Sequence, residues 1–301
     1  MKRVIYKNYL KSNLIGVITL ILILLELIIG FGTLALINIP RSIIRSQRFK
    51  VFLYRKSNQI GEYTVLGLKY ILQLMHGKHS IQIISDKNLS VDNWYLAISN
   101  HSSWADIFVI LVATNYRVPL LKIFMKKELW WIPFVFLANK ALNMPFVHRH
   151  SRLEIEKNPS LRLKDYENTI QSCKRFHRSP TTVFSYAEGT RHTNEKHVEQ
   201  ASPYKNFLKP KVGGIATALS AIPQIDKLID CTIVYKSTER SSWAFLKGEM
   251  RDVKVHIKEY EIPEELKNKD YLNDNTYRNN FKNWIDELWL EKDKKFEELK
   301  F

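Results

Sequence analysis

One uninterrupted apolar segment constrains this 301-residue chain more than any other feature. It runs for 26 residues, from Leu14 to Ile39, and Glu26 is its only charged residue. About 20 apolar residues span a bilayer as a helix, so the segment is long enough to cross one. It is too long for the core of a signal peptide, and no small-residue cleavage site follows it before Pro40. We therefore expect a retained membrane helix, either spanning the bilayer or lying along one leaflet.

Basic residues flank the apolar segment on both sides, and the larger number lies on its carboxyl side. This bias predicts that the rest of the chain is cytoplasmic. Glu26 is costly in the middle of a bilayer, so it either marks a functional contact or is protonated or packed against another helix. The flanking residues are Lys2, Arg3, Lys7 and Lys11 before the segment, and Arg41, Arg45, Arg48, Lys50, Arg55 and Lys56 after it.

The charge of the whole chain indicates a polyanionic partner. Its formal net charge is +16 and its isoelectric point is near 9.6, values that suit nucleic acid, anionic lipid headgroups or phosphorylated substrates. Hydrophobic residues make up 45% of the chain, which excludes a disordered protein. Only Cys173 and Cys231 are present, and we expect both to be reduced thiols in a cytosol-facing domain.

Short apolar strands alternate with helical patterns after the apolar segment. This alternation predicts an α/β fold, a layered mixed sheet flanked by helices and preceded by the membrane helix. We expect residues 1–50 to form the anchor and residues 51–301 to form the domain. The aromatic run 130–137 suits either the core or a lipid contact. The expected strands are 94–99, 120–125, 144–147, 181–186, 229–235 and 253–257, and the expected helices are 63–74, 107–113, 161–178, 215–221 and 277–290.

A histidine and a carboxylate stand five positions apart at His101 and Asp106. A carboxylate can fix the tautomer of an imidazole, and a neutral imidazole can take a proton from a hydroxyl near pH 7. The chain has no Gly-x-Ser-x-Gly elbow, and neither cysteine stands beside a His/Asn constellation. A base without an enzyme nucleophile predicts that a bound alcohol attacks directly. The alternative is structural: His101 caps the next helix and Asp106 is a first-turn acid.

Polar clusters follow three of the short strands, at His101, at Arg149 and at Glu188-Gly189-Thr190-Arg191. Ligands of open α/β sheets bind beyond the carboxyl ends of strands, so this coincidence favours an active site. Arg149 and Arg191 suit a phosphate because guanidinium forms a planar fork, although a lone arginine is usually a solvated loop charge. Lys211 precedes Gly213-Gly214, where backbone amides at a helix start would also favour an anion.

The histidines outside this pattern do not have the spacing of a metal site. No His-Glu-x-x-His or Cys-x-x-Cys motif is present, so we expect solvated loop histidines and neither metal nor prosthetic group. The histidines concerned are His148, His150, His192 and His197.

Two blocks together resemble the glycerolipid acyltransferases, the 1-acylglycerol-3-phosphate O-acyltransferase (PlsC-like) family. They are Asn-His-Ser-Ser-Trp-Ala-Asp at 100–106 and Glu-Gly-Thr-Arg at 188–191. Phe-Val-His-Arg at 146–149 is similar to the second block of the family, and the apolar residues 231–235 stand where its fourth block belongs. The long insert after Arg191 resembles the branch with lysocardiolipin acyltransferases and bacterial membrane relatives. The usual Phe-Pro before the glutamate is Tyr186-Ala187 here.

The resemblance implies transfer of a fatty acyl group from acyl-CoA, or from acyl carrier protein, to the hydroxyl of a lysophospholipid. The first acceptor to consider is 1-acylglycerol-3-phosphate, which gives phosphatidic acid, and lysocardiolipin is an alternative. His101, held by Asp106, would be the base. The substrate-binding residues implied are Arg149 and Arg191 as a phosphate clamp, Glu188 as a brace, Gly189 at the oxyanion, and Thr190 and Lys211.

The resemblance also implies a bacterial inner membrane location with the domain facing the cytoplasm. The partners would then be the two substrates and anionic membrane lipids, without nucleic acid. The rival class is a non-catalytic, membrane-tethered basic module that binds anionic lipid or nucleic acid. A nucleic-acid binder needs a basic stripe with stacking aromatics, whereas the basic residues here are scattered. The presence of both His101 and Asp106 favours the enzyme.

Overall fold

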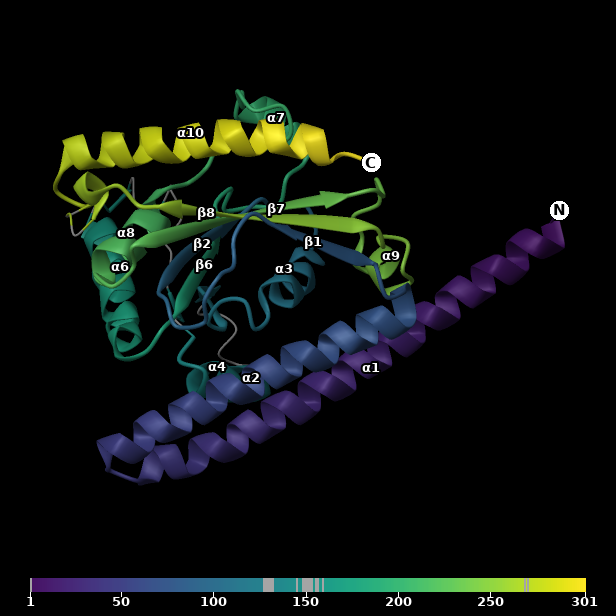
Figure 1. Cartoon of the computed structure of the whole chain (residues 1–301), viewed down its shortest axis with the longest axis horizontal. Helices are drawn as coiled ribbons and strands as arrows, with labels where there is room; N and C mark the ends of the chain where they lie inside the picture. Colours follow the sequence, from purple (N-terminus) through teal and green to yellow (C-terminus); the bar gives the residue numbers. More distant parts are fainter. Residues whose placement is uncertain are drawn as a thin grey trace.

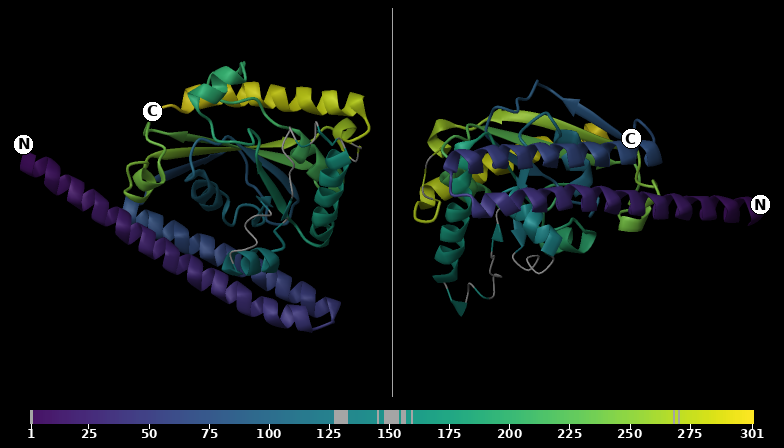
Figure 2. Two further views of the ribbon diagram at one scale, coloured as in Figure 1. Left: turned by 180° about the vertical axis from the view of Figure 1, so that it is seen from behind. Right: turned by 90° about the horizontal axis from the view of Figure 1, so that it is seen from below.

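A helical hairpin and a sheet domain make up the molecule (Figures 1 and 2). The computed structural model describes residues 2–126, 133–144, 146–147, 154, 157–158, 160–267, 269 and 271–301. Two long helices, α1 (Lys2–Ile43) and α2 (Gln47–His76), run side by side along the domain. The later elements are β1 (Ile81–Ser85), β2 (Tyr95–Ser99), α3 (Asp106–Thr114), β3 (Leu121–Ile123), β4 (Met125–Lys126), α4 (Pro133–Ala141), β5 (Phe146–Val147), α6 (Ser160–Cys173), the 3-10 helix η2 (Lys174–Arg178), β6 (Thr182–Tyr186), α7 (Asn194–Glu199), α8 (Gly213–Ala221), β7 (Lys227–Tyr235), α9 (Ser242–Leu246), β8 (Val253–Glu261), the 3-10 helix η3 (Glu264–Leu266) and α10 (Asn275–Leu299).

The main sheet is mixed and has six strands in the order β1-β8-β7-β2-β6-β3. Strands β7, β2, β6 and β3 are parallel to one another, whereas β8 runs antiparallel to β7 and β1 runs parallel to β8. Ser99 at the end of β2 is level with Tyr186 of β6 and with Cys231 of β7. The carboxyl ends of β2 and β6 are therefore level at one edge of the sheet, and β7 continues past them in the same direction to Tyr235. The predicted α/β layered mixed sheet is confirmed.

Alternate residues of β2 point to opposite faces of the sheet and enter two different cores. Tyr95 and Ala97 pack in a core with residues of α2, α3 and α9. Leu96 and Ile98 pack in a second core with α8 and with a stripe of α10 that includes Phe281. Helices thus cover both faces, as parallel strands require, and Figure 1 shows α10 on one side and α3 with the hairpin on the other.

Helix α1 buries one narrow stripe against the protein and leaves many of its other apolar residues exposed. The stripe recurs every three or four residues, as helical periodicity demands, and includes Thr19, Ile23, Leu34 and Asn38. Residues Leu10–Arg41 are long and apolar enough to cross a membrane. Exposed on the other sides of the helix are Leu14, Val17, Ile18, Ile21, Leu24, Leu25, Ile28, Ile29 and Leu36.

Glu26 packs against α2, which answers the question raised by its position in the apolar segment. A Cβ added to Gly67 of α2 would lie 2.3 Å from Glu26 Oε1, so the glycine makes room for the carboxyl group. Gly30 similarly faces Thr64, because a Cβ there would lie 2.3 Å from Thr64 Oγ1. The two helices approach closely at these glycines, and the interpretation of Glu26 as a helix-packed residue is the one that fits.

Several element predictions were incomplete. Helix α2 begins 16 residues before the expected start at Tyr63, because its first turns face the protein with residues such as Ser57 and Gly61 that carry little apolar signal. The expected strand 120–125 is divided into β3 and β4, and the expected helix 161–178 ends as a 3-10 turn. Strand β1 and the short helices α7 and α9 were not predicted. Residues 130–132 of the aromatic run lie outside the described residues, and Pro133–Ala141 forms α4.

Candidate functional site

The turn after β2 carries the candidate base and is anchored to β7 by Asn100. The Asn100 side chain donates to the carbonyl of Ile233 at 3.0 Å and accepts from its N–H at 2.9 Å. This amide thus continues the β2–β7 ladder by one step after the β2 backbone has turned away. Asn100 is buried, and both polar groups of its side chain are hydrogen-bonded. The next residue, His101, therefore leaves the sheet in a fixed direction.

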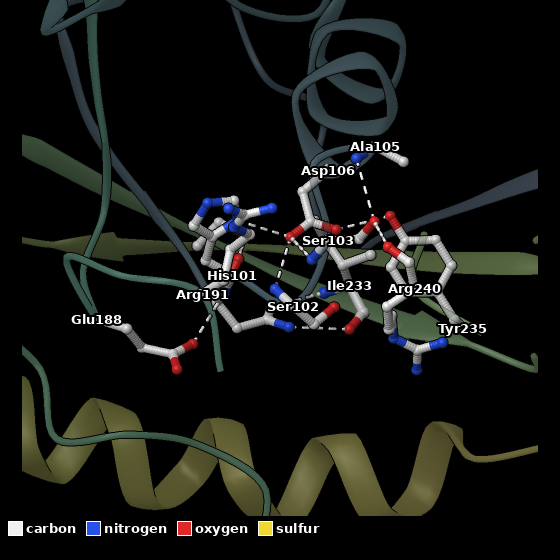
Figure 3. Close-up of polar contacts among 12 residues, drawn as sticks. His101, Ser102, Ser103, Ala105, Asp106, Glu188, Arg191, Ile233, Tyr235 and Arg240 are labelled. Carbon is white, nitrogen blue, oxygen red and sulfur yellow. Dashed lines mark hydrogen bonds and ion pairs between the residues drawn. The ribbon is translucent and has the colours of Figure 1, made fainter. Parts of the chain in front are cut away.

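His101 and Asp106 form the hydrogen-bonded pair that their spacing predicts (Figure 3). The distance from His101 Nδ1 to Asp106 Oδ2 is 2.8 Å. An ionised carboxylate only accepts, so Nδ1 carries the proton and Nε2 keeps its lone pair. The Asp106 side chain is fully buried, whereas 19% of the His101 side chain is exposed, and no described residue hydrogen-bonds Nε2. The pair therefore presents a basic nitrogen on its open side.

Asp106 is held by more bonds than the one to His101. Its Oδ2 also accepts from the backbone N–H groups of Ser102 at 2.7 Å and Ser103 at 2.9 Å. Its Oδ1 accepts from the hydroxyl of Tyr235, at the end of β7, at 2.7 Å. Burial and the charge of Asp106 raise the pKa of Tyr235 well above its usual value, so this phenol stays a donor. Asp106 also opens α3, where the helix dipole favours an anion.

Tyr186, the last residue of β6, supports the His101 ring from one face. The two rings are stacked, with centroids 3.9 Å apart and planes 12° apart. Burial, together with the nearby Asp106, raises the pKa of Tyr186 well above its usual value. The Tyr186 hydroxyl is buried and has no hydrogen-bond partner among the described residues, and the same is true of Ser102 Oγ nearby. The ring restricts His101 to one orientation by stacking, without bonding to either nitrogen.

Glu188 ties the loop after β6 to the turn after β2. One carboxyl oxygen accepts from the His101 N–H at 2.9 Å, and the other accepts from the Leu208 N–H at 3.1 Å. The side chain is fully buried, and burial raises its pKa from 4.5 to about 7 against the lowering effect of the two N–H groups. Glu188 thus acts on the backbone of His101 and does not touch the imidazole.

The next three residues form a turn with a basic surface. Gly189 has a φ of +68°, which favours glycine, and a Cβ there would lie 2.9 Å from the Lys211 side chain. Lys211 is fixed at this turn because its N–H donates to Ala187 O at 2.7 Å. Thr190 Oγ1 accepts from Lys196 Nζ at 2.8 Å. The Arg191 side chain is exposed, lies on the His101 side of the site in Figure 3, and has no ion pair with any described residue.

Arg240 and His192 also border the site. The Arg240 guanidinium lies over the Tyr235 ring, 4.8 Å from its centroid, and Ser103 Oγ donates to the Arg240 carbonyl at 2.9 Å. The N–H of His192 donates to His101 O at 2.7 Å, and burial, then His197 and Arg240, lowers the pKa of its ring. No group of three or more potential metal ligands occurs among the described residues.

The structure brings together every predicted site residue that it describes: His101, Asp106, Glu188, Gly189, Thr190, Arg191 and Lys211. Arg149 lies outside the described residues. Tyr235, Lys196 and Arg240 were not predicted. Tyr235 could have been found from its place at the end of a strand that neighbours β2, but no local signal marks the other two.

These features define an α/β domain with an imidazole–carboxylate pair and a basic turn at the carboxyl edge of its sheet. The chain belongs to the Acyltransferase family, whose sequence profile matches residues 80–236, and that range contains all of the residues above except Arg240. The fold is similar to that in the crystal structure of the 1-acyl-sn-glycerophosphate (LPA) acyltransferase PlsC from Thermotoga maritima. The TM-score is 0.55 at 15% identity, over 96% of this chain and 97% of that one. No curated protein sequence matches the chain significantly.

Proposed function

We propose that this acyltransferase moves a fatty acyl group from a thioester to the hydroxyl of a lysophospholipid, and that His101 is its general base. The observation that carries the proposal is the bond between His101 Nδ1 and the buried Asp106, which leaves Nε2 as the open, basic nitrogen. The family match supports the reaction class. The fold neighbour is a lysophosphatidate acyltransferase, which favours 1-acylglycerol-3-phosphate as acceptor over lysocardiolipin.

In the proposed reaction His101 Nε2 takes the proton of the acceptor hydroxyl as its oxygen attacks the thioester carbonyl. The carbon–sulfur bond then breaks, and the protonated imidazole returns the proton to the leaving thiolate. Asp106 stabilises the imidazolium between these steps. The described part of the site offers no cysteine, because Cys231 and Cys173 are fully buried and burial raises the pKa of each to about 12. Direct attack by the acceptor is thus the route that these residues support.

The turn Glu188–Arg191 is proposed to bind the acceptor phosphate. Arg191 and Lys211 carry positive charge without a described ion-pair partner, next to a base that must reach a hydroxyl a few bonds away from that phosphate. Thr190 and the backbone of Gly189 complete the turn, while Glu188 fixes the start of the turn by accepting from the His101 and Leu208 N–H groups. Arg149 is proposed as a second arm of the clamp, on the strength of its family block. Acyl-CoA and acyl carrier protein are both anionic donors that suit the net charge of +16.

We further propose that the chain works at a bacterial inner membrane, with its domain on the cytoplasmic side and α1 within residues 1–50 as the anchor. Helix α1 packs along α2 through one stripe and exposes apolar side chains elsewhere. Such a surface is larger than a soluble monomer normally leaves exposed. Because α1 is attached to the domain along its length, the structure favours insertion into one leaflet over an independent span. Carbonate extraction of the full-length protein tests the attachment, and a wholly soluble protein would contradict it.

One assay tests the reaction. The purified chain in detergent is incubated with labelled acyl-CoA, or acyl carrier protein, and a panel of lysophospholipids, and the labelled product is identified. We expect transfer to lysophosphatidate; preferential transfer to lysocardiolipin would identify the long-insert branch. If no lysophospholipid is acylated by either donor, while the protein is folded, the proposal is wrong.

A further inference from the structure

The segment between Arg191 and Lys211 is an insert that reaches from the candidate site to α10, and its helix α7 lies beside α10 (Figures 1 and 2). Its far end is fixed on α10, because Asp293 accepts from the N–H groups of Lys205 at 2.7 Å and of Asn206 at 3.0 Å. The side-chain amide of Asn206 also donates to Asp293, at 2.8 Å. The insert therefore has a fixed position relative to the sheet domain.

Helix α7 of this insert brings one lysine back to the turn after β6. Lys196 Nζ donates to Thr190 Oγ1 at 2.8 Å and to the carbonyl of Arg191 at 3.2 Å. The backbone of Lys196 is held as well, since its N–H donates to the side chain of Thr193, the N-cap of α7, at 3.3 Å. An ammonium group has three hydrogens, and no described residue accepts the third. Lys196 thus lies at the turn with a donor to spare.

The charge of Lys196 is not neutralised by any ion pair with a described residue. The adjacent acid, Glu195, is exposed, and its pKa is lowered first by its own N–H group and last by Lys196. Arg191 and Lys211 on the same turn likewise have no ion pair within the described part of the chain. Glu188, the acid of the turn itself, is fully buried and accepts from backbone N–H groups with both oxygens. The turn and its insert therefore present three cationic groups together.

The number of cations bears on the kind of phosphate that fits the site. A phosphate monoester has three terminal oxygens and a charge of about −1.5 to −2 near pH 7. A phosphate diester has only two terminal oxygens and a charge of about −1. Three cationic groups supply one partner for each terminal oxygen of the monoester, whereas a diester leaves one of them without an acceptor. The set therefore favours the monoester by both attraction and mismatch.

We propose that Lys196 is a specificity-determining residue of the acceptor site, which selects acceptors with a phosphate monoester over acceptors with a phosphate diester. The inference rests on the proposed transfer to lysophospholipids and adds the residue that discriminates among them. The insert supplies the third cation, and its bonds to α10 hold that cation at the turn. Lysophosphatidate is a monoester, whereas the phosphates of lysophosphatidylglycerol and lysocardiolipin are diesters.

The test compares two single variants of the full-length protein in detergent. Lys196→Gln removes the cation at the turn. Lys205→Gln removes the same charge from the far end of the insert, where Lys205 Nζ bonds to Glu297 Oε2 of α10 at 2.7 Å. Acceptor kcat/KM is measured with lysophosphatidate and with lysophosphatidylglycerol of the same acyl chain, at a saturating donor concentration. Thermal unfolding checks that both variants are folded.

The ratio of the two kcat/KM values is the decisive quantity. Lys196→Gln should lower kcat/KM about 10- to 100-fold for lysophosphatidate and only about threefold or less for lysophosphatidylglycerol. Lys205→Gln should change either value by about twofold at most, because an exposed ion pair contributes little. Equal losses towards both acceptors in Lys196→Gln would reduce Lys196 to a brace of the turn and overturn the proposal. A wild-type preference for the diester would overturn it as well.

A binding measurement separates this inference from the proposed function. Calorimetry with glycerol 3-phosphate, a monoester, and with glycerophosphoglycerol, a diester, needs no turnover. If the wild type acylates no lysophospholipid, the proposed reaction is wrong, and binding alone then decides the role of Lys196. Weaker binding of the monoester by Lys196→Gln than by Lys205→Gln supports the assignment, and equal binding by the two variants overturns it.

Discussion

Two buried carboxylates, Asp230 on β7 and Asp106 at the start of α3, bond to their basic partners in different ways. Asp230 of β7 pairs with Lys292 of α10 at 2.7 Å, and the fully buried ammonium group also donates to Cys231 O and Thr232 Oγ1. Asp106, the first residue of α3, bonds to a histidine that keeps one ring nitrogen open. A pair such as Asp230–Lys292, in which every ammonium hydrogen is already bonded, can only stabilise the fold. A pair with a free, partly exposed nitrogen can also react, and this difference is why His101–Asp106 is the pair proposed for catalysis.

The strongest test of the His101–Asp106 pair is removal of the proposed base, His101. His101→Ala should lower kcat about 10²–10⁴-fold, the usual contribution of a general base, at nearly unchanged stability because the side chain is partly exposed. Asp106→Asn should give a comparable loss by favouring the wrong imidazole tautomer. Asp106→Ala is a poorer choice, since it would leave Ser102 N, Ser103 N and the Tyr235 hydroxyl without an acceptor. Turnover near wild type in folded His101→Ala would contradict the mechanism.

Breaking the Asp230–Lys292 pair should instead lower stability and leave turnover unchanged. Lys292→Met removes the only cation bonded to Asp230 among the described residues and leaves a buried, uncompensated carboxylate. We expect a loss of about 3–5 kcal/mol in the free energy of unfolding, measured by chemical denaturation in detergent. Turnover per folded molecule should stay close to wild type. A stable protein with greatly reduced kcat would instead connect this pair to the chemistry.

Glu188 is a third buried carboxyl group, and its titration makes the stability of the protein depend on pH. Burial raises its pKa from 4.5 to about 7 in the folded protein, so folding favours its protonated form. Its contribution to stability is therefore complete below pH 4.5 and is lost as the pH rises to about 7. At 1.36 kcal/mol per unit the loss is about 3 kcal/mol.

Glu188→Gln removes this titration, so the stability difference between wild type and variant should change by most of that amount between pH 5 and pH 8. Chemical denaturation of both proteins at the two pH values measures it. Every other titrating group is common to both proteins and cancels in the difference. Parallel curves would show that Glu188 has an ordinary pKa.

Arg191 is the exposed counterpart of Lys292, a cation whose described surroundings leave its charge uncompensated. Arg191→Lys keeps the charge but loses the bidentate fork, so acceptor kcat/KM should fall about 10- to 150-fold, with the donor KM little changed. Steady-state kinetics with acyl-CoA and lysophosphatidate varied separately will measure the two effects. A defect confined to the donor would contradict the phosphate assignment.

The sequence predicted best what depends on neighbouring residues. His101 and Asp106 are five positions apart, so one turn brings them together, and their bond follows from spacing alone. The bond from His101 N to Glu188 crosses 87 residues and needs the register of β2 against β6, which no local pattern encodes. The first part of α2 was missed because its buried positions include Ser57 and Gly61, which do not count as apolar, and Gly61 is in close contact with Leu120 and Leu142. Strand β1 lies at the sheet edge, only partly buried, so its apolar signal is weak.

The hydrogen bonds of Asn100 have a consequence for how the chain is made. Its partner, Ile233, is 133 residues further along, and parallel pairings of such long range form slowly. During synthesis the turn that holds His101 thus has no fixed direction until β7 has left the ribosome, although α1 and α2 are complete long before. With α1 as the proposed anchor, the chain would meet the membrane first and complete its proposed active site last. A fragment that ends before Ile233 should attach to lipid and remain inert.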